Sequence, residues 1–121
     1  MAQEHPRIAV TSEDGVSVAE LVDKKILDEQ AISEIAERLY ALAAEADAPR
    51  IVLDFANVGH MSSSALGMLI TLHKRVREKG GQLRLCNIRP SIYEVFVITR
   101  LNEVLTICAS RDEAVQDASS V

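Results

Sequence analysis

Three consecutive serines, Ser62, Ser63 and Ser64, are the residues of this chain whose type and spacing point most directly to chemistry. They follow an apolar segment, residues 51–55, that we predict to be a buried strand, and they precede a segment with the apolar period of a helix. A hydroxyl at a helix start can cap the helix, and it can also accept a phosphate, because the free backbone N–H groups there favour an anion. The serines therefore indicate a helix cap, a phosphorylation switch, or both.

Catalysis by these serines is the first alternative to weigh. A nucleophilic serine needs a base within hydrogen-bond reach and a third group that orients the base. The run lacks the G-x-S-x-G pattern, since Met61 and Ala65 flank it, and we interpret His60 as a loop residue and His73 as a partly buried core residue. Paired carboxylates, metal-ligand spacing and a Gly-rich phosphate loop are all missing from the sequence. We therefore expect a protein that is not an enzyme and uses no cofactor or metal.

The composition predicts one soluble, cytoplasmic domain. The chain has 121 residues, 48% hydrophobic and 26% charged, which suits one compact domain with a real core. Its net charge of −5 argues against binding to nucleic acid, and the most basic stretch, residues 74–79, lies at a predicted helix end that favours cations. No apolar run approaches a membrane span, and residues 1–6 do not begin a signal peptide. Cys86 and Cys108 fit small buried residues in a reducing compartment.

The apolar patterning predicts strands that alternate with helices. Residues 7–11 and 16–22, joined by a Glu-Asp-Gly turn signal, predict an antiparallel hairpin, and further strands are expected at residues 51–55, 82–86 and 104–108. Four helices are expected, with Asp28 capping the first, the serines opening the second, Pro90 opening the third and Ser110 capping the fourth. This order predicts an α/β fold, a small mixed β-sheet of an initial hairpin followed by βα units, with the helices packed mainly on one side.

The second predicted helix carries two apolar stripes. The first is expected to face the core, and it comprises Leu66, Leu69, Ile70, His73 and Val76. The second comprises Ala65, Met68 and Leu72, which lie three and four residues apart and off the first stripe. This second stripe either packs under a loop or a neighbouring helix, or belongs to a binding surface beside the serines.

Residues 52–69 resemble the central signature of the STAS domain family, and within that family the bacterial anti-anti-sigma factors. The chain reads V-L-D-F-x-N-V-x-x-M-S-S-S-A-L-G-x-L, where the family has a strand ending in Asp, an Asn-Val pair and then Asp-Ser-Ser/Thr-Gly-Leu-Gly. Residues 80–83, Pro90 and residues 101–107 are similar as well, so the resemblance runs over roughly residues 7–117 of a single domain spanning 1–121. Two positions differ: Ser62 replaces the family Asp, and Ala65 replaces the family Gly.

The resemblance implies an anti-sigma factor antagonist that acts by partner switching. Unphosphorylated, such a protein binds an anti-sigma factor serine kinase; phosphorylated at the position of Ser63 it lets go, and a serine phosphatase restores it. Because Ser62 replaces an Asp, Ser62 and Ser64 stay open as alternative acceptors. We expect no Lys or Arg near this helix start, so the charge of the phosphate would not be neutralised locally and would act on the bound partner. The partner-binding residues expected here are Asn57, Met61, Ser62, Ser63, Ser64, Ala65, Met68 and Leu72.

A second function stays open beside the switch. A constitutive STAS adaptor or structural domain, in a signalling or transport assembly, would have the same fold and would use the serine run only as a helix cap. Neither function requires nucleic acid or direct membrane insertion. Phosphate on Ser63 is the observation that separates the two.

Overall fold

The computed structural model describes residues 7–120. The prediction that residues 1–6 do not begin a signal peptide therefore lies outside the described residues. A five-stranded sheet has the order β1-β2-β4-β6-β7, in which β1 runs antiparallel to β2 and the other neighbours are parallel. The strands are β1 (Ile8–Glu13), β2 (Val16–Leu21), β4 (Arg50–Asp54), β6 (Gln82–Cys86) and β7 (Thr106–Cys108). The predicted hairpin and mixed sheet are thus confirmed.

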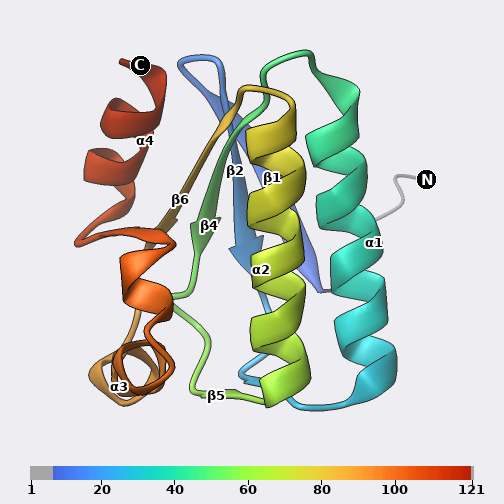
Figure 1. Ribbon diagram of the computed structural model, residues 1–121, viewed down its shortest axis with the longest axis vertical. Coiled ribbons are helices and arrows are strands. Elements are labelled where there is room, and N and C mark those ends of the chain that lie inside the picture. The colour runs from blue at the N-terminus through green and yellow to red at the C-terminus, as the bar shows by residue number, and fades with distance from the viewer. Residues whose placement is uncertain (1–6, 121) are drawn as a thin grey trace.

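The helices cover the two faces of this sheet unequally. Helices α1 (Glu29–Glu45) and α2 (Ser63–Glu78) lie side by side over one face, and α3 (Pro90–Ile98) contributes to the same large core (Figure 1). Helix α4 (Arg111–Ser119) covers the opposite face, where it packs against β2, β4 and β6. The prediction of four helices mainly on one side is confirmed, and α4 explains why Val16 and Val18, on the second face of β2, are also buried.

Local signals start and end the helices where the sequence predicts. The carboxylate of Asp28 accepts a 3.0 Å hydrogen bond from the N–H of Ala31, and the hydroxyl of Ser110 accepts one of 3.2 Å from the N–H of Glu113. Helix α2 ends just before Gly80, whose φ of +72° lies in the left-handed region that glycine adopts without strain. The last strand is shorter than expected and starts at Thr106, because Leu101–Glu103 form a short 3₁₀ helix, η1, ahead of it.

Of the two alternatives for the second apolar stripe of α2, the structure shows packing against a neighbouring helix. Ala65, Met68 and Leu72, the second stripe, are buried in the large core, where α2 packs along α1. From the expected core stripe, Ile70 and His73 are only half-buried. Helix α1 packs along α2, so the side of α2 that carries the second stripe is buried as well as the side that faces the sheet.

Candidate functional site

The chain that leads into α2 is held by a second, very small sheet. Strand β3 (Lys25–Ile26) pairs in parallel with β5 (His60–Met61), and the N–H of Ser62 donates a 3.1 Å hydrogen bond to the carbonyl of Ile26. This pairing is not predictable from the sequence, and the interpretation of His60 as a loop residue is wrong, because two-residue strands carry no periodicity. The pairing anchors the start of α2 to the connection between β2 and α1.

The three serines at this helix start have three different environments. Ser62 is the N-cap, with φ −93° and ψ 170°, and its hydroxyl accepts a 3.2 Å hydrogen bond from the N–H of Ala65. The hydroxyl of Ser64 donates a 3.0 Å hydrogen bond to the carboxylate of Glu29, the first residue of α1. Ser63 is exposed, and its hydroxyl bonds to no other residue in the described part of the chain.

The backbone beside Ser63 suits an anion. The N–H of Leu66 makes the first helical bond, to the carbonyl of Ser62, and the N–H of Ala65 is taken by the cap. The N–H groups of Ser63 and Ser64 precede the first helical bond, so they stay open to solvent or to a negative group. A phosphate carried by Ser63 would therefore lie at the positive end of α2.

The two departures from the family pattern fit this geometry. Serine and aspartate are both strong N-cap residues, so Ser62 keeps the cap that an Asp would make. The methyl group of Ala65 is fully buried in the core at the third residue of α2, a position that accepts alanine more readily than glycine. The local fold of the motif therefore tolerates both replacements.

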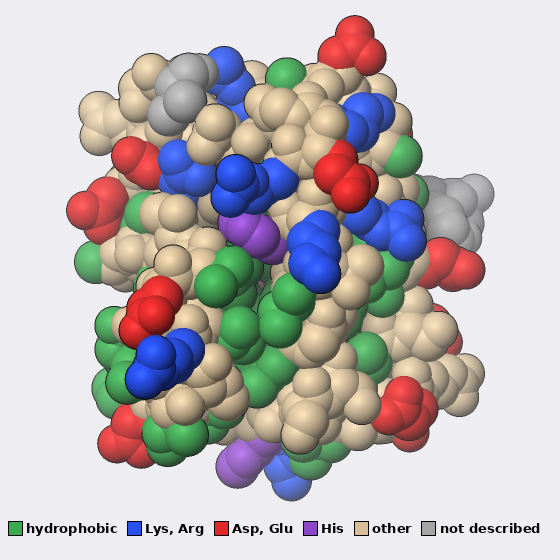
Figure 2. All heavy atoms as spheres, viewed as in Figure 1, with side chains coloured by type: hydrophobic (Ala, Val, Ile, Leu, Met, Phe, Trp, Pro, Cys, Tyr) green, Lys and Arg blue, Asp and Glu red, His purple; other side chains and the backbone are tan. Residues whose placement is uncertain are grey.

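The expectation of a corner without cations is wrong. Lys25 is the register partner of His60, and the carbonyl of Lys24 accepts bonds from the N–H groups of Gly59 and His60. Figure 2 shows histidine and basic side chains together at the lower edge of the molecule, which is the end where α2 begins in Figure 1. Lys25 therefore lies beside the run that leads into Ser63, a proximity that the sequence order hides.

The predicted partner-binding residues divide by exposure. Ser63 and Ser64 are exposed, whereas Asn57, Met61 and Ser62 are half-buried. The assignment of Ala65, Met68 and Leu72 to a partner surface is wrong for this conformation, because their side chains are buried in the core. The accessible surface of the site therefore consists of the β4–β5 connection and the first turn of α2.

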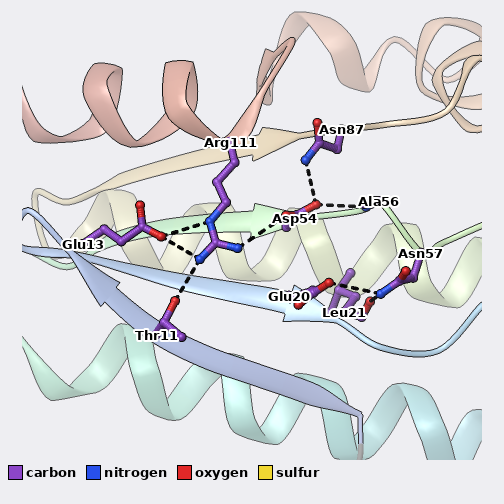
Figure 3. A network of polar contacts seen from close by, with 9 residues as sticks. All are labelled: Thr11, Glu13, Glu20, Leu21, Asp54, Ala56, Asn57, Asn87 and Arg111. Atoms are coloured by element: carbon purple, nitrogen blue, oxygen red, sulfur yellow. Dashed lines mark hydrogen bonds and ion pairs between the residues drawn. The ribbon is translucent and has the colours of Figure 1, made fainter.

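A buried carboxylate organises the chain that leads to this site. Asp54, at the end of β4, accepts 3.0 Å hydrogen bonds at Oδ1 from the N–H of Ala56 and from the side-chain amide of Asn87 (Figure 3). Its Oδ2 lies 3.9 Å from a guanidinium nitrogen of Arg111, the first residue of α4. Asp54 is the one charged residue buried in the described part of the chain. Its contacts hold together the ends of β4 and β6 and the start of α4.

The same network reaches both strands of the hairpin. Arg111 donates to Glu13 at 2.6 and 3.1 Å and to the hydroxyl of Thr11 at 3.0 Å, and its hydrogen bond with Glu13 raises the pKa of its guanidinium (Figure 3). The amide of Asn57 donates to the carboxylate of Glu20 at 3.2 Å and lies 3.4 Å from the carbonyl of Leu21. Asn57, predicted as a partner contact, therefore also fastens the loop before the serines to β2.

The cysteines lie opposite each other in adjacent strands. Cys86 of β6 and Cys108 of β7 are register partners with free thiols, a juxtaposition that their spacing in the sequence did not indicate. Burial, with the nearby Asp54 carboxylate, raises the pKa of the Cys86 thiol to about 12, and burial also raises the pKa of the Cys108 thiol. Both thiols are therefore protonated and weakly nucleophilic at neutral pH.

Residues 7–120 contain neither a metal-binding cluster nor a membrane-spanning helix. Within that range no three His, Cys, Asp or Glu side chains gather in a way that could hold a metal ion. The helices of the same range are too short or too polar to cross a bilayer.

Known proteins share both the sequence pattern and the fold. The sequence model of the STAS domain family matches residues 7–114. The anti-sigma-B factor antagonist of Bacillus subtilis is 34% identical over 80 residues, which cover 66% of this chain and 72% of that protein. An anti-sigma-factor antagonist domain protein from Planctomyces limnophilus has a TM-score of 0.85 at 27% identity, covering 93% of this chain and 97% of its own. SpoIIAA from Bacillus, solved in its phosphorylated form, shares the fold with a TM-score of 0.68 at 18% identity, covering 91% and 97%.

Proposed function

Because the chain belongs to the STAS domain family and is similar to anti-sigma factor antagonists, we propose that it binds an anti-sigma factor serine kinase and is switched off by phosphorylation of Ser63. The observation that carries the proposal is the separate environment of Ser63 among the three serines. Its hydroxyl is exposed and uncommitted within the described residues, whereas Ser62 caps α2 and Ser64 binds Glu29. A kinase can therefore reach Ser63 without undoing the helix start.

The charge change supplies the physical basis of the switch. A phosphate adds about −1.5 to −2 charges at neutral pH. The open N–H groups of Ser63 and Ser64 can donate hydrogen bonds to it, so α2 tolerates the added charge. A docked partner surface, by contrast, would have to desolvate the phosphate. A loss of about 2.8 kcal/mol in binding lowers affinity about a hundredfold, which is enough to release the kinase.

The proposed partner surface is narrower than the one read from the sequence. It comprises Met61, Ser63 and Ser64, with Asn57 and Ser62 holding the backbone that presents them. Lys25 and His60, which lie beside this run through the β3–β5 pairing, join it as polar contacts. A serine phosphatase that restores the binding form completes the proposed cycle. SpoIIAA, which has the same fold, is known in a phosphorylated form, and this supports the proposal.

The experiment that tests the proposal is phosphosite mapping, followed by binding measurements. Peptide mass spectrometry on protein purified from its own cells, at rest and under stress, should find one phosphate on Ser63 with an occupancy that changes. Ser63→Asp should weaken binding of the cognate kinase at least about tenfold, which is a loss of about 1.4 kcal/mol, whereas Ser63→Ala should keep it. Ser33→Ala, an exposed serine on α1, is the matched control and should change neither result.

Two outcomes would count against the switch. One is the absence of phosphate under both conditions although the cognate kinase is active, and the other is equal binding by the Asp and Ala variants. Either result would favour the constitutive adaptor, in which Ser62 caps α2 and Ser63 has no regulatory role.

A further inference from the structure

A hollow lies on the surface far along α2 from the serines. It has a volume of about 340 Å³ and lies between the second half of α2, the start of β6 and the chain leading into β7. His73, Arg77, Gln82, Arg84, Val104 and Thr106 are among its lining residues, and we call it the α2–β6 hollow. Figure 2 shows a histidine side chain in a recess with Lys and Arg side chains around its rim. His73 is ten residues beyond Ser63, which places the hollow about 15 Å along the helix.

The charge of the hollow is opposite to that of the chain. The whole sequence has 18 Asp and Glu against 13 Lys and Arg, yet two arginines and a histidine line the hollow and none of its lining residues is acidic. Arg77 is exposed and makes no side-chain hydrogen bond or ion pair with another described residue. A cation without a carboxylate partner, beside a concave surface, favours an anionic ligand.

Arg84 is positioned by its other contacts. Its Nε forms an ion pair with Asp117 of α4, and its Nη1 donates a 3.0 Å hydrogen bond to the carbonyl of Leu83. These contacts fix the plane of the guanidinium in the wall of the hollow. Asp117 itself does not line the hollow, so it partly neutralises Arg84 without occupying the space in front of it.

Neutral donors complete the set. Gln82 of β6 and Thr106 of β7, which carry a neutral amide and a hydroxyl, line the same space, and Val104 adds an apolar residue. His73 is half-buried, and burial together with the neighbouring charge of Arg77 lowers the pKa of its imidazole. An anion bound between the two would reverse that electrostatic effect, so His73 reports on occupancy.

We propose that the α2–β6 hollow binds a phosphate-class anion, either inorganic phosphate or the phosphate group of a small organic monoester. A tetrahedral oxyanion offers several acceptor oxygens in different directions, which matches donors that come from α2, β6 and β7. The forked guanidinium of Arg77 is suited to hold two of those oxygens at once, and Arg84 adds positive charge to the wall of the hollow. The site is independent of Ser63 and of the proposed kinase interface.

A titration followed by amide and imidazole NMR tests the proposal on the full chain. At constant ionic strength and neutral pH, inorganic phosphate or O-phosphoserine should produce saturable shifts at the amides of Gly81, Gln82 and Thr106. The imidazole pKa of His73 should rise on saturation. Equal affinity for the two probes identifies the free ion as the ligand, and tighter binding of O-phosphoserine identifies the monoester.

Matched variants separate a site from general charge. Arg77→Gln should weaken binding at least about tenfold, the size expected for one charge-assisted hydrogen bond. Arg75→Gln removes the same charge from the same helix, but the Arg75 guanidinium lies 4.3 Å from the centre of the Tyr40 ring and outside the hollow, so it should leave binding unchanged. Absence of saturable shifts with both probes, equal weakening by the two variants, or an unchanged His73 pKa would overturn the proposal.

Discussion

The hydroxyl of Ser64 donates a 3.0 Å hydrogen bond to the carboxylate of Glu29, and this contact joins the first turn of α2 to the first residue of α1. It makes Ser64 a poor place for a second negative charge, because a phosphate there would lose the hydrogen bond and face a carboxylate. The preference that we propose for Ser63 over Ser64 therefore rests on a contact between residues 35 positions apart.

Ser63→Ala should abolish phosphorylation rather than move it to Ser64. The double variant Ser63→Ala with Glu29→Gln should then restore some phosphate at Ser64, because it removes the opposing carboxylate. Peptide mass spectrometry of each variant from its own cells measures this. Full transfer of the phosphate to Ser64 in the single variant would show that Glu29 does not control the choice.

Ser62→Ala should lower the free energy of unfolding by about 1 kcal/mol, since the N–H of Ala65 would lose its capping acceptor. Ser62→Asp should be at least as stable as the natural protein, because a carboxylate caps equally well and interacts with the helix dipole. Urea unfolding measures both. Ser63→Ala is the neighbouring control and should change stability by less than about 0.5 kcal/mol; equal losses for both alanine variants would contradict the cap.

Asp54→Ala should cost about 2–4 kcal/mol of stability, since it leaves Ala56, Asn87 and Arg111 without a buried acceptor. Asp54→Asn should cost less, because one oxygen can still accept from Ala56 and Asn87. Asp47→Ala, in an exposed connection, is the matched control. Urea unfolding with amide hydrogen exchange at Ala56 measures the effect, and a loss as small as that of Asp47→Ala would remove Asp54 from its anchoring role.

Stability should fall in alkaline solution partly through Cys86. The pKa of this thiol is raised from 9.0 to about 12 in the folded chain, so between these values the unfolded chain loses the proton while the folded chain keeps it. The stabilisation is complete below pH 9.0 and is lost progressively up to about pH 12, with a slope of up to about 1.4 kcal/mol per pH unit. Cys86→Ala should flatten this dependence in urea unfolding. Identical slopes in variant and natural protein would refute it, and Cys108→Ala provides the comparison.

Local signals explain why much of the fold could be predicted from the sequence. Alternation of apolar residues indicated β1, β2, β4 and β6, and the caps Asp28 and Ser110 act on N–H groups only three residues away. The motif around the serines was recognised because its residue types follow one another in the chain. Each of these features depends on neighbours in the sequence, so no tertiary contact is needed to detect it.

Tertiary structure decided which surfaces and side chains are available. The burial of Met68 and Leu72, the β3–β5 pairing and the Ser64–Glu29 contact depend on where other segments pack. The contact between Arg111 and Glu13 joins residues 98 positions apart. The sequence by itself determined the order of the main strands and helices, the capped helix start and the family. The packing of α1 and α4 on the sheet decided which serine is free and which residues meet in the α2–β6 hollow, because such contacts arise only when distant segments fold together.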